Sequence, residues 1–439
     1  MPAYSRDQIT SWTLIPEQWE NLALQIPYKL PRLQDSNGSS VTFDDLAEIY
    51  TEECVRIELF EGDYGQKAQI AIPGQVIDEY RKYRPTPLVR AHGLERHLNY
   101  QGRIFYKRED CNPTGSHKPN TAIPQSYYAR SQGLSGLITD TGAGQWGTAL
   151  AWSCHNLGLR CTVFMTRSSY DSKPYRRHLM SLCGADVHSS PSDVTEPGRM
   201  LLDTGHDHSG SLGIGMSEAL ALVRTTPGTR LALGCVSYYA AMHQTVIGQE
   251  LEQQLRLGEI APDYLIGCVG GGTNFIGFVA PFLTQASRGD KRSSPQLVAV
   301  ESLSIPVLTK GEYRYDSQDR FGLTPSVQMY TLGRDFVSPE IHAGGLRYHG
   351  KSPLLSLMIH EGLVTAVAID QEEAFRAGRL FFESEGVLPA PESSHAIAQV
   401  LRQIKEDIRR DAKSTIVFCL SGTGYLDLSA YAKIFKLAD

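Results

Sequence analysis

The chain has 439 residues, of which 41% are hydrophobic and 21% are charged, and its formal net charge is −6. This composition is that of a globular protein long enough for two packed domains. It argues against nucleic acid or an anionic membrane as a partner, because no basic run is longer than two or three residues.

The pattern along the chain predicts an α/β protein. Residues 1–40 have weak periodicity and are rich in proline and aromatic residues, which predicts an arm over the core. Helical patterns follow at 41–62 and 75–83, and prolines fix an extended segment at 84–88. Strands are then predicted at 103–107, 137–140, 161–165, 265–269, 297–300 and 415–420, and helices at 118–132, 146–157, 173–183 and 274–283. Strands that alternate with amphipathic helices predict parallel sheets covered on both faces.

Three glycine-rich turns each follow a predicted strand, at 141–147, 270–274 and 421–424. A strand, a glycine turn and a helix N-terminus together form an anion site, because bare N–H groups and the helix dipole attract negative charge. The turn at 270–274 matches neither nucleotide pattern, because it has no GK[ST] and Phe275 stands where the third glycine of GxGxxG would fall. One such turn can be an ordinary connection, but three predict a small phosphate or a carboxylate as ligand.

Lys118 stands where a predicted helix begins, directly after Gly115, Ser116 and His117. A cation is electrostatically misplaced at a helix N-terminus. Burial and the positive end of the dipole would both lower the pKa of Lys118, which suits a neutral nucleophile or a Schiff base. For this residue alone, an exposed lysine after a turn remains the alternative.

Seven motifs occur in one order along the chain: RPTPL, GSHKPNTA, TGAGQWG, CVGGGTN, HAGGLRYHG, PAPESSHA and LSGTG. Together they resemble the tryptophan synthase β chain from about Trp12 to about Leu428. The resemblance is to the second subgroup of that family, which has an extended N-terminal region and a tryptophan after TGAGQ. Each motif alone has modest specificity, whereas seven in sequence are highly specific.

The resemblance implies the pyridoxal-5′-phosphate (PLP) fold type II, with two three-layer α/β domains and the cofactor between them. We expect an N-terminal arm with cap helices at 1–83 and a smaller domain at 84–241, which includes a mobile segment at about 140–226. The larger domain, at 242–439, is expected to hold the cofactor phosphate.

The resemblance also implies which residues bind the cofactor. Lys118 matches the lysine that forms the Schiff base and moves protons, and His117 matches the neighbour that supports the phosphate. The other expected cofactor-binding residues are Asn120, Gly270, Gly271, Gly272, Thr273, Asn274, Glu392 and Ser421. A hydroxyl at Ser421 would leave the pyridine nitrogen unprotonated, which favours loss of a β-substituent. Glu392 matches a carboxylate near the cofactor 3′-oxygen, although an ordinary acid at a helix N-terminus would explain it too.

The implied reaction is β-replacement on L-serine or O-phospho-L-serine through an aminoacrylate, with indole or a substituted indole as the acceptor. Lys118, Asp140 and Glu392 are the expected catalytic residues. The substrate is expected to contact Asp140, Thr141, Gly142, Ala143, Gly144, Gln145, Trp146 and Arg347. Closure of the mobile segment would keep water from the aminoacrylate.

Asp140 departs from the family pattern, in which a glutamate precedes TGAGQ and hydrogen-bonds the indole nitrogen. Aspartate is shorter by one methylene, a reach of roughly 1.5 Å. A loss of this size can cost on the order of 100-fold in rate. This departure favours a nucleophile other than indole, or a substituted indole that lies closer. The alternative is a backbone shift that restores the contact between the carboxylate and the indole nitrogen.

Arg347 is a second departure, since the main subgroup has an acidic residue nearby that addresses the serine hydroxyl. A guanidinium with His349 close by suits an anionic leaving group such as phosphate. We therefore hypothesise that O-phospho-L-serine is accepted as donor. The alternative is a structural arginine that closes the domains.

The sequence leaves other functions open. Threonine synthase, cysteine synthase and serine/threonine dehydratase share the architecture, but TGAGQWG and PAPESSHA argue against them. A non-catalytic PLP-binding paralogue is disfavoured by Lys118. The segment 206–215 is polar and predicts a surface loop, and its His206 and His208 have no matching distal metal ligands.

The expected partners are small-molecule substrates and a second copy of the chain, because a homodimer is the usual state of the family. The sequence does not decide whether an α-chain partner binds, and we expect none. A monovalent cation near the active site is a family feature that the sequence does not locate.

The eight cysteines are scattered without a CxxC pair, which favours reduced thiols and a cytoplasmic enzyme.

Overall fold

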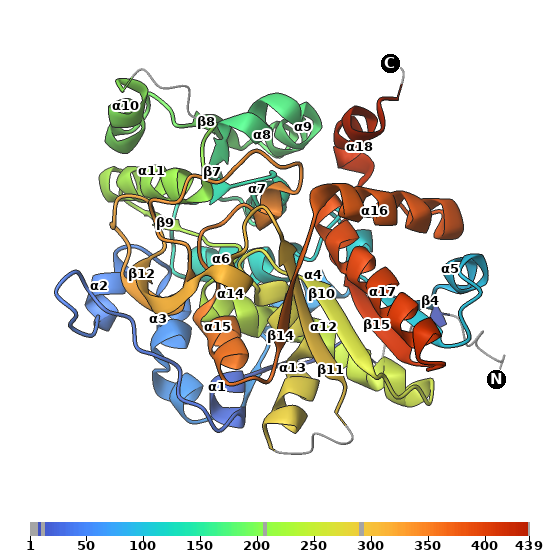
Figure 1. Ribbon diagram of the computed structural model, residues 1–439. Coiled ribbons are helices and arrows are strands. Elements are labelled where there is room, and N and C mark those ends of the chain that lie inside the picture. The colour runs from blue at the N-terminus through green and yellow to red at the C-terminus, as the bar shows by residue number, and fades with distance from the viewer. Residues whose placement is uncertain (1–7, 10–13, 205–208, 289–293, 438–439) are drawn as a thin grey trace.

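The computed structural model describes residues 8–9, 14–204, 209–288 and 294–437. Two sheets dominate the molecule, and helices cover both faces of each (Figure 1). Within the described residues, no helix is both long enough and apolar enough to cross a membrane.

The larger sheet has seven strands in the order β1-β4-β5-β15-β10-β11-β14. They are β1 (Gln8–Ile9), β4 (Leu88–Arg90), β5 (Arg103–Arg108), β10 (Tyr264–Cys268), β11 (Gln296–Ser302), β14 (Thr365–Ile369) and β15 (Thr415–Leu420). Pairing is parallel from β5 to β14, whereas β4 is antiparallel to both β1 and β5. Every residue of β15 is buried, as a strand between two helical layers requires.

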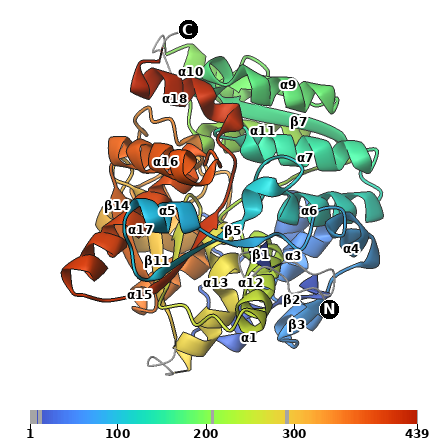
Figure 2. The same ribbon diagram turned by 90° about the vertical axis from the view of Figure 1, so that its right-hand side faces the viewer.

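Alternate side chains of the central strands enter two different cores. Val417 and Cys419 pack into the core beside α13 (Thr273–Ser287) and α12 (Tyr238–Leu257). Ile416 and Phe418 pack into the core beside α17 (Pro391–Arg409) on the opposite face. The helices α16 (Gln371–Glu385) and α5 (His92–His97) complete this second layer (Figure 2).

The smaller sheet is all parallel, in the order β8-β7-β6-β9. Its strands are β6 (Gly136–Thr141), β7 (Arg160–Thr166), β8 (Asp186–Ser190) and β9 (Thr229–Leu231). One face carries α6 (Pro119–Ser131), α7 (Gln145–Asn156) and α9 (Pro174–Leu182). The other face carries α11 (Leu212–Thr225), with α10 (Glu196–Leu202) packed on it.

The remaining elements surround these two bodies. At the N-terminal side lie β2 (Gln18–Glu20), β3 (Gln69–Ala71), α1 (Leu22–Gln25), α2 (Phe43–Ala47), α3 (Glu52–Leu59) and α4 (Gly74–Tyr80). The others are α8 (Arg167–Ser172), α14 (Val307–Lys310), the hairpin of β12 (Glu312–Ser317) and β13 (Ser326–Thr331), α15 (Pro353–His360) and α18 (Leu428–Phe435).

Two expectations differ from the structure. The strands β4 and β5, which the division at residue 84 places in the smaller domain, pair within the larger sheet. An apolar run shows that a strand is buried, but it carries no information about which sheet the strand joins.

The surface loop expected at 206–215 is wrong at its C-terminal end, because α11 begins at Leu212 and Gly213, Ile214 and Gly215 are buried. His206 and His208 lie outside the described residues.

Candidate active site

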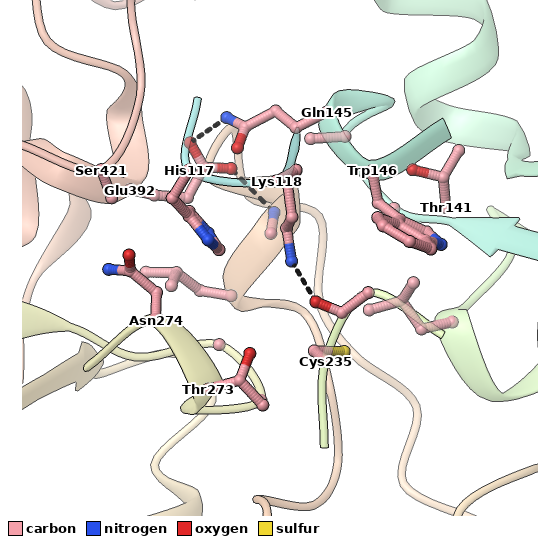
Figure 3. Close-up of a pocket in the computed structure, with 18 of the residues that line it drawn as sticks. His117, Lys118, Thr141, Gln145, Trp146, Cys235, Thr273, Asn274, Glu392 and Ser421 are labelled. Carbon is pink, nitrogen blue, oxygen red and sulfur yellow. Dashed lines mark hydrogen bonds between the residues drawn. The ribbon is translucent and has the colours of Figure 1, made fainter. Parts of the chain in front are cut away.

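A pocket lies between the two sheets, at the carboxyl ends of β6, β10 and β15 (Figure 3). Ligands of open α/β sheets bind at this edge. The pocket has an empty volume of about 800 Å³, which includes space open to solvent at its mouth. Its lining residues are His117, Lys118, Asp140, Thr141, Gly142, Ala143, Gln145, Trp146, Leu212, Met216, Leu233, Gly234, Cys235, Cys268, Gly270, Gly271, Gly272, Thr273, Asn274, Gly345, Leu346, Glu392 and Ser421.

Lys118 immediately precedes α6 and extends its side chain into this pocket (Figure 3). Its Nζ donates a hydrogen bond of 2.7 Å to the carbonyl oxygen of Gly234. Burial lowers the pKa of Lys118, and Asp140 and Glu392 only partly oppose this effect. The amine can therefore lose its proton more readily than an exposed lysine, as a nucleophile or general base requires.

The glycine turn after β10 leaves its backbone donors free. No hydrogen bond among the described residues uses the N–H of Gly270, Gly271 or Gly272. Gly272 has a φ of +104°, and a Cβ at Gly271 would lie 2.6 Å from Cys235 Cβ, so larger residues would close the turn. The 15-residue helix α13 begins directly after it and has no side-chain cap. This arrangement can hold an anion.

His117 adds an unpaired polar atom to the same pocket. Its Nδ1 is buried and has no hydrogen-bond partner in the described structure. Burial, with the charge of Lys118 as a second cause, holds the pKa of His117 well below its ordinary value. A neutral imidazole with a free ring nitrogen suits a donor to a phosphate. Together with the free N–H groups of the glycine turn, it fits the phosphate of PLP.

The loop between β6 and α7 forms the opposite wall. Gly144 precedes α7 with a φ of +89°, and a Cβ at Gly142 would lie 2.8 Å from the carbonyl oxygen of Gly344. The side chain of Gln145 donates to Glu392 Oε2 at 3.2 Å, and Trp146 Nε1 donates to Thr139 Oγ1 at 2.7 Å. The indole of Trp146 is thereby held as an apolar surface of the pocket.

Asp140 is buried at the end of β6, where its side chain faces the pocket. Burial raises the pKa of Asp140 to about 7, although its own backbone N–H and the charge of Lys118 act in the opposite direction. The α11 helix approaches closely, since a Cβ at Gly215 would lie 3.1 Å from Asp140 Cβ. A carboxyl group poised near neutral pH can accept or donate a proton.

Ser421 lies at the end of β15 in a short chain of hydroxyl and thiol groups. Its Oγ is 2.8 Å from Ser393 Oγ and 3.3 Å from Cys268 Sγ. Ser393 also accepts a hydrogen bond of 3.2 Å from the N–H of Gly422. The side chain of Ser421 is therefore held in place as a neutral donor or acceptor without a charged partner.

Three of the predicted site residues do not line the pocket: Asn120, Gly144 and Arg347. Asn120 instead belongs to a buried network, in which it accepts from Arg84 at 2.7 Å and donates to Glu109 at 3.0 Å. Arg347 donates to Ser168 Oγ at 2.6 Å and to the Ser338 carbonyl oxygen at 3.3 Å.

Sequence reasoning missed the apolar side of the pocket, formed by Leu212, Met216, Leu233 and Leu346. Leu212 and Met216 are one helical turn apart at the start of α11. Their spacing is a signal of a helix face, but the polar segment before them concealed it. Cys235 and Cys268 also line the pocket, and nothing in their local sequence distinguishes them from core cysteines. No group of three or more potential metal ligands occurs among the described residues.

Comparison with known proteins agrees with this geometry. The family model "Pyridoxal-phosphate dependent enzyme" matches residues 80–422. The chain is 46% identical to the tryptophan synthase beta chain 2 of Thermotoga maritima, over 95% of this chain and 97% of that protein. It is 44% identical to the tryptophan synthase beta chain of Pyrococcus horikoshii, over 95% of this chain and 90% of that protein.

Solved structures share the fold at lower identity. A fungal L-serine ammonia-lyase from Rhizomucor miehei matches 80% of this chain and 98% of its own, with a TM-score of 0.60 and 17% identity. The processed form of threonine deaminase isoform 2 from Solanum lycopersicum matches 83% of this chain and 92% of its own, with a TM-score of 0.60 and 17% identity. Two α/β bodies with the pocket between them are thus the architecture of PLP fold type II.

Proposed function

The chain belongs to the pyridoxal-phosphate-dependent enzymes and, within them, to the tryptophan synthase β chains, and on this premise we propose that it joins a serine-derived three-carbon unit to an indole or a substituted indole. The product is L-tryptophan or an analogue. The observation that carries the proposal is one pocket that combines Lys118, a free anion-binding turn and an apolar wall beside Asp140.

PLP, when bound, supplies the electron sink that allows an amino acid to lose its α-proton and its β-substituent. The glycine turn and His117 are proposed to hold the phosphate, and Ser421 to face the pyridine nitrogen. Glu392 is proposed to lie beside the 3′-oxygen side of the cofactor. Its two oxygens accept from Gln145 at 3.2 Å and from the N–H of Gly345 at 2.8 Å, which fixes the carboxylate in one orientation.

Lys118 is proposed to take the α-proton of the donor and later to return it. The pKa lowered by burial favours the neutral amine that this role needs. The loop from Thr141 to Gln145 is proposed to bind the donor carboxylate through the N-terminus of α7. The apolar side chains of Leu212, Met216 and Leu346 then exclude water from the reacting carbon, which favours addition of the nucleophile over hydrolysis.

Asp140 is proposed to orient the acceptor by accepting a hydrogen bond from its ring N–H. The shorter side chain and the close approach of α11 favour an acceptor that reaches deeper toward β6 than unsubstituted indole. The variant Asp140→Glu tests this, because it extends the carboxylate. A faster reaction with indole and a slower one with substituted indoles would support it, whereas a slower reaction with both would count against it.

O-phospho-L-serine is proposed as donor alongside L-serine. Arg347 supports this choice, because it is buried and forms no ion pair within the described residues. Burial lowers the pKa of Arg347, and a nearby anion would relieve that cost. Since the guanidinium contacts Ser168 and Ser338 here, it must turn toward the pocket to contact a donor phosphate.

The deciding experiment is mass-spectrometric product analysis of the PLP-loaded protein with indole and either donor. Tryptophan is the expected product, and the faster donor shows whether Arg347 serves a phosphate. Pyruvate without tryptophan would contradict indole as acceptor and would point to another nucleophile. If phosphoserine is not turned over while L-serine is, the donor proposal for Arg347 fails.

A further inference from the structure

Lys351 is a fully buried lysine directly behind the glycine turn, and no step proposed above uses it. Its Nζ donates a hydrogen bond of 3.3 Å to the carbonyl oxygen of Val269. The next residue, Ser352, donates its backbone N–H to the carbonyl oxygen of Gly271 at 2.7 Å. Residues 351 and 352 thus hold two carbonyl groups of the turn on one side.

The geometry of the peptide bond determines where the N–H groups on the other side of the turn point. In a planar trans peptide, the carbonyl of one residue and the N–H of the next point in opposite directions. Holding the carbonyls of Val269 and Gly271 therefore directs the N–H groups of Gly270 and Gly272 away from Lys351. Gly270 and Gly272 line the pocket, and neither N–H has a partner within the described residues.

Within the described residues, the ammonium group of Lys351 pairs only with Glu301, and at a long distance. The nearest carboxylate oxygen, Glu301 Oε2, is 3.7 Å from Nζ. Glu301 is already engaged, because it accepts from the N–H of Leu308 at 2.8 Å and from that of Thr309 at 2.9 Å. Burial lowers the pKa of Lys351, and Glu301 acts against this effect. An under-compensated buried ammonium is costly unless an anion lies nearby.

We propose that Lys351 is a positioning residue for the cofactor phosphate. It holds the carbonyl of Val269 so that the N–H of Gly270 faces the phosphate, and it places a positive charge behind the turn. The inference rests on the proposed assignment of the glycine turn to the phosphate. Lys351 does not line the pocket, so it acts through the backbone and not by contact with the ligand.

The test compares the affinity of the apo-protein for PLP with its affinity for pyridoxal, which lacks the phosphate. Lys351→Met removes the charge and the donor, and Lys351→Gln removes the charge but keeps a donor. Lys310→Met is the matched control, because Lys310 is exposed at the end of the helix that Glu301 caps. Absorbance titration gives each dissociation constant, and thermal unfolding of the apo-protein reports whether each variant folds.

We expect Lys351→Met to weaken PLP binding by about 10- to 100-fold, the effect of losing one charge-assisted hydrogen bond. Pyridoxal binding should stay unchanged, Lys351→Gln should give an intermediate loss, and the control should behave as the parent. Equal losses for PLP and pyridoxal, or no loss for either, would overturn the proposal. If Lys351→Met does not fold, the affinities of Lys351→Gln for PLP and pyridoxal provide the test.

This measurement is independent of turnover. If the parent forms no tryptophan while Lys351→Met loses PLP selectively, the proposed function fails and the role of Lys351 stands. If the parent forms tryptophan while the affinity ratio is unchanged, the role of Lys351 fails and the proposed function stands.

Discussion

The side-chain amide of Gln145 donates a hydrogen bond of 3.2 Å to Glu392 Oε2, and this contact joins the two α/β bodies across the pocket. Gln145 begins α7 on the smaller sheet, and Glu392 lies in the first turn of α17 on the larger one. The loop proposed to bind the donor carboxylate is therefore anchored to the body that is proposed to hold the cofactor.

Replacing Gln145 by alanine should release this anchor. We expect kcat/KM for the amino-acid donor to fall by about 10- to 100-fold, because a hydrogen bond to a charged acceptor is lost. Steady-state kinetics with a fixed acceptor measure this, and Gln101→Ala, at an exposed glutamine, is the control. An unchanged kcat/KM would show that the loop is positioned without Glu392.

Lys118 should be the residue that carries the cofactor. Borohydride reduction of the PLP-loaded protein, followed by peptide mass spectrometry, should place the added mass on the peptide that contains Lys118. Lys118→Met should lose this label, and product formation should fall by about a thousandfold or more, since the proposed base is removed. A label on Lys351 or on another lysine would contradict the assignment.

The sequence indicated which residues meet in this pocket better than it indicated which sheet each strand joins. Lys118, Asp140, Glu392 and Ser421 each end or follow a predicted strand or begin a predicted helix, so their convergence on one sheet edge could be inferred. The contacts of Asn120 with Arg84 and Glu109 could not be inferred, because these partners lie in other elements of the chain.

The rest of the fold depended on contacts that local patterns do not contain. The apolar residues of β5 predict a strand, yet only its pairing with β15 shows that this strand belongs to the larger sheet. Likewise, Leu212 and Met216 reach the pocket because α11 packs on β6 and β7, a packing that the preceding polar segment does not reveal.

Asp140 should give the reaction a pH dependence near neutrality. Burial raises its pKa to about 7, so the carboxylate that is proposed to orient the acceptor predominates only above that pH. We expect the rate of tryptophan formation to rise through about pH 7 and then level off. Asp140→Asn should be slower and should lack this rise, and a parent profile that is flat from pH 6 to 8 would contradict the role.

The same carboxyl group should reduce stability at high pH. Its pKa is higher in the folded state than its ordinary value of 3.8, so the folded protein binds the proton more tightly than the unfolded chain. The free energy of unfolding must then decrease as the pH rises from about 4 to about 7. Asp140→Asn should therefore have a higher Tm than the parent at pH 8, and the difference should shrink at pH 5.

Asp427 forms a second link between the two bodies, and its removal should destabilise the protein. Its carboxylate accepts from Lys173 Nζ at 2.6 Å and from Arg176 Nη2 at 2.9 Å, and all three side chains are buried. Burial raises the pKa of Asp427, but Lys173 and Arg176 together lower it by more, and the result lies below the ordinary value. Asp427→Asn would leave two buried cations without their counter-ion.

We expect Asp427→Asn to cost about 3–5 kcal/mol of unfolding free energy at pH 7, as removal of one partner from a buried ion pair does. Because a carboxylate with a lowered pKa stabilises the fold only while it is ionised, the parent should lose this advantage as the pH falls below about 4. Denaturant unfolding at pH 7 and pH 3.5 measures both effects. Asp335→Asn is the control, since Asp335 pairs with Arg320 while 81% exposed and should change stability by less than about 1 kcal/mol.

Asp427→Asn should also weaken binding of the amino-acid donor. The side chain of Arg176 packs under the loop that is proposed to bind the donor carboxylate, where a Cβ at Gly144 would lie 3.0 Å from Arg176 Cβ. If Arg176 moves when its counter-ion is removed, the loop moves with it, and KM for the donor should rise while the spectrum of bound PLP stays unchanged. A stability loss with an unaltered KM would mean that Asp427 only fastens the two bodies together and has no part in positioning the loop.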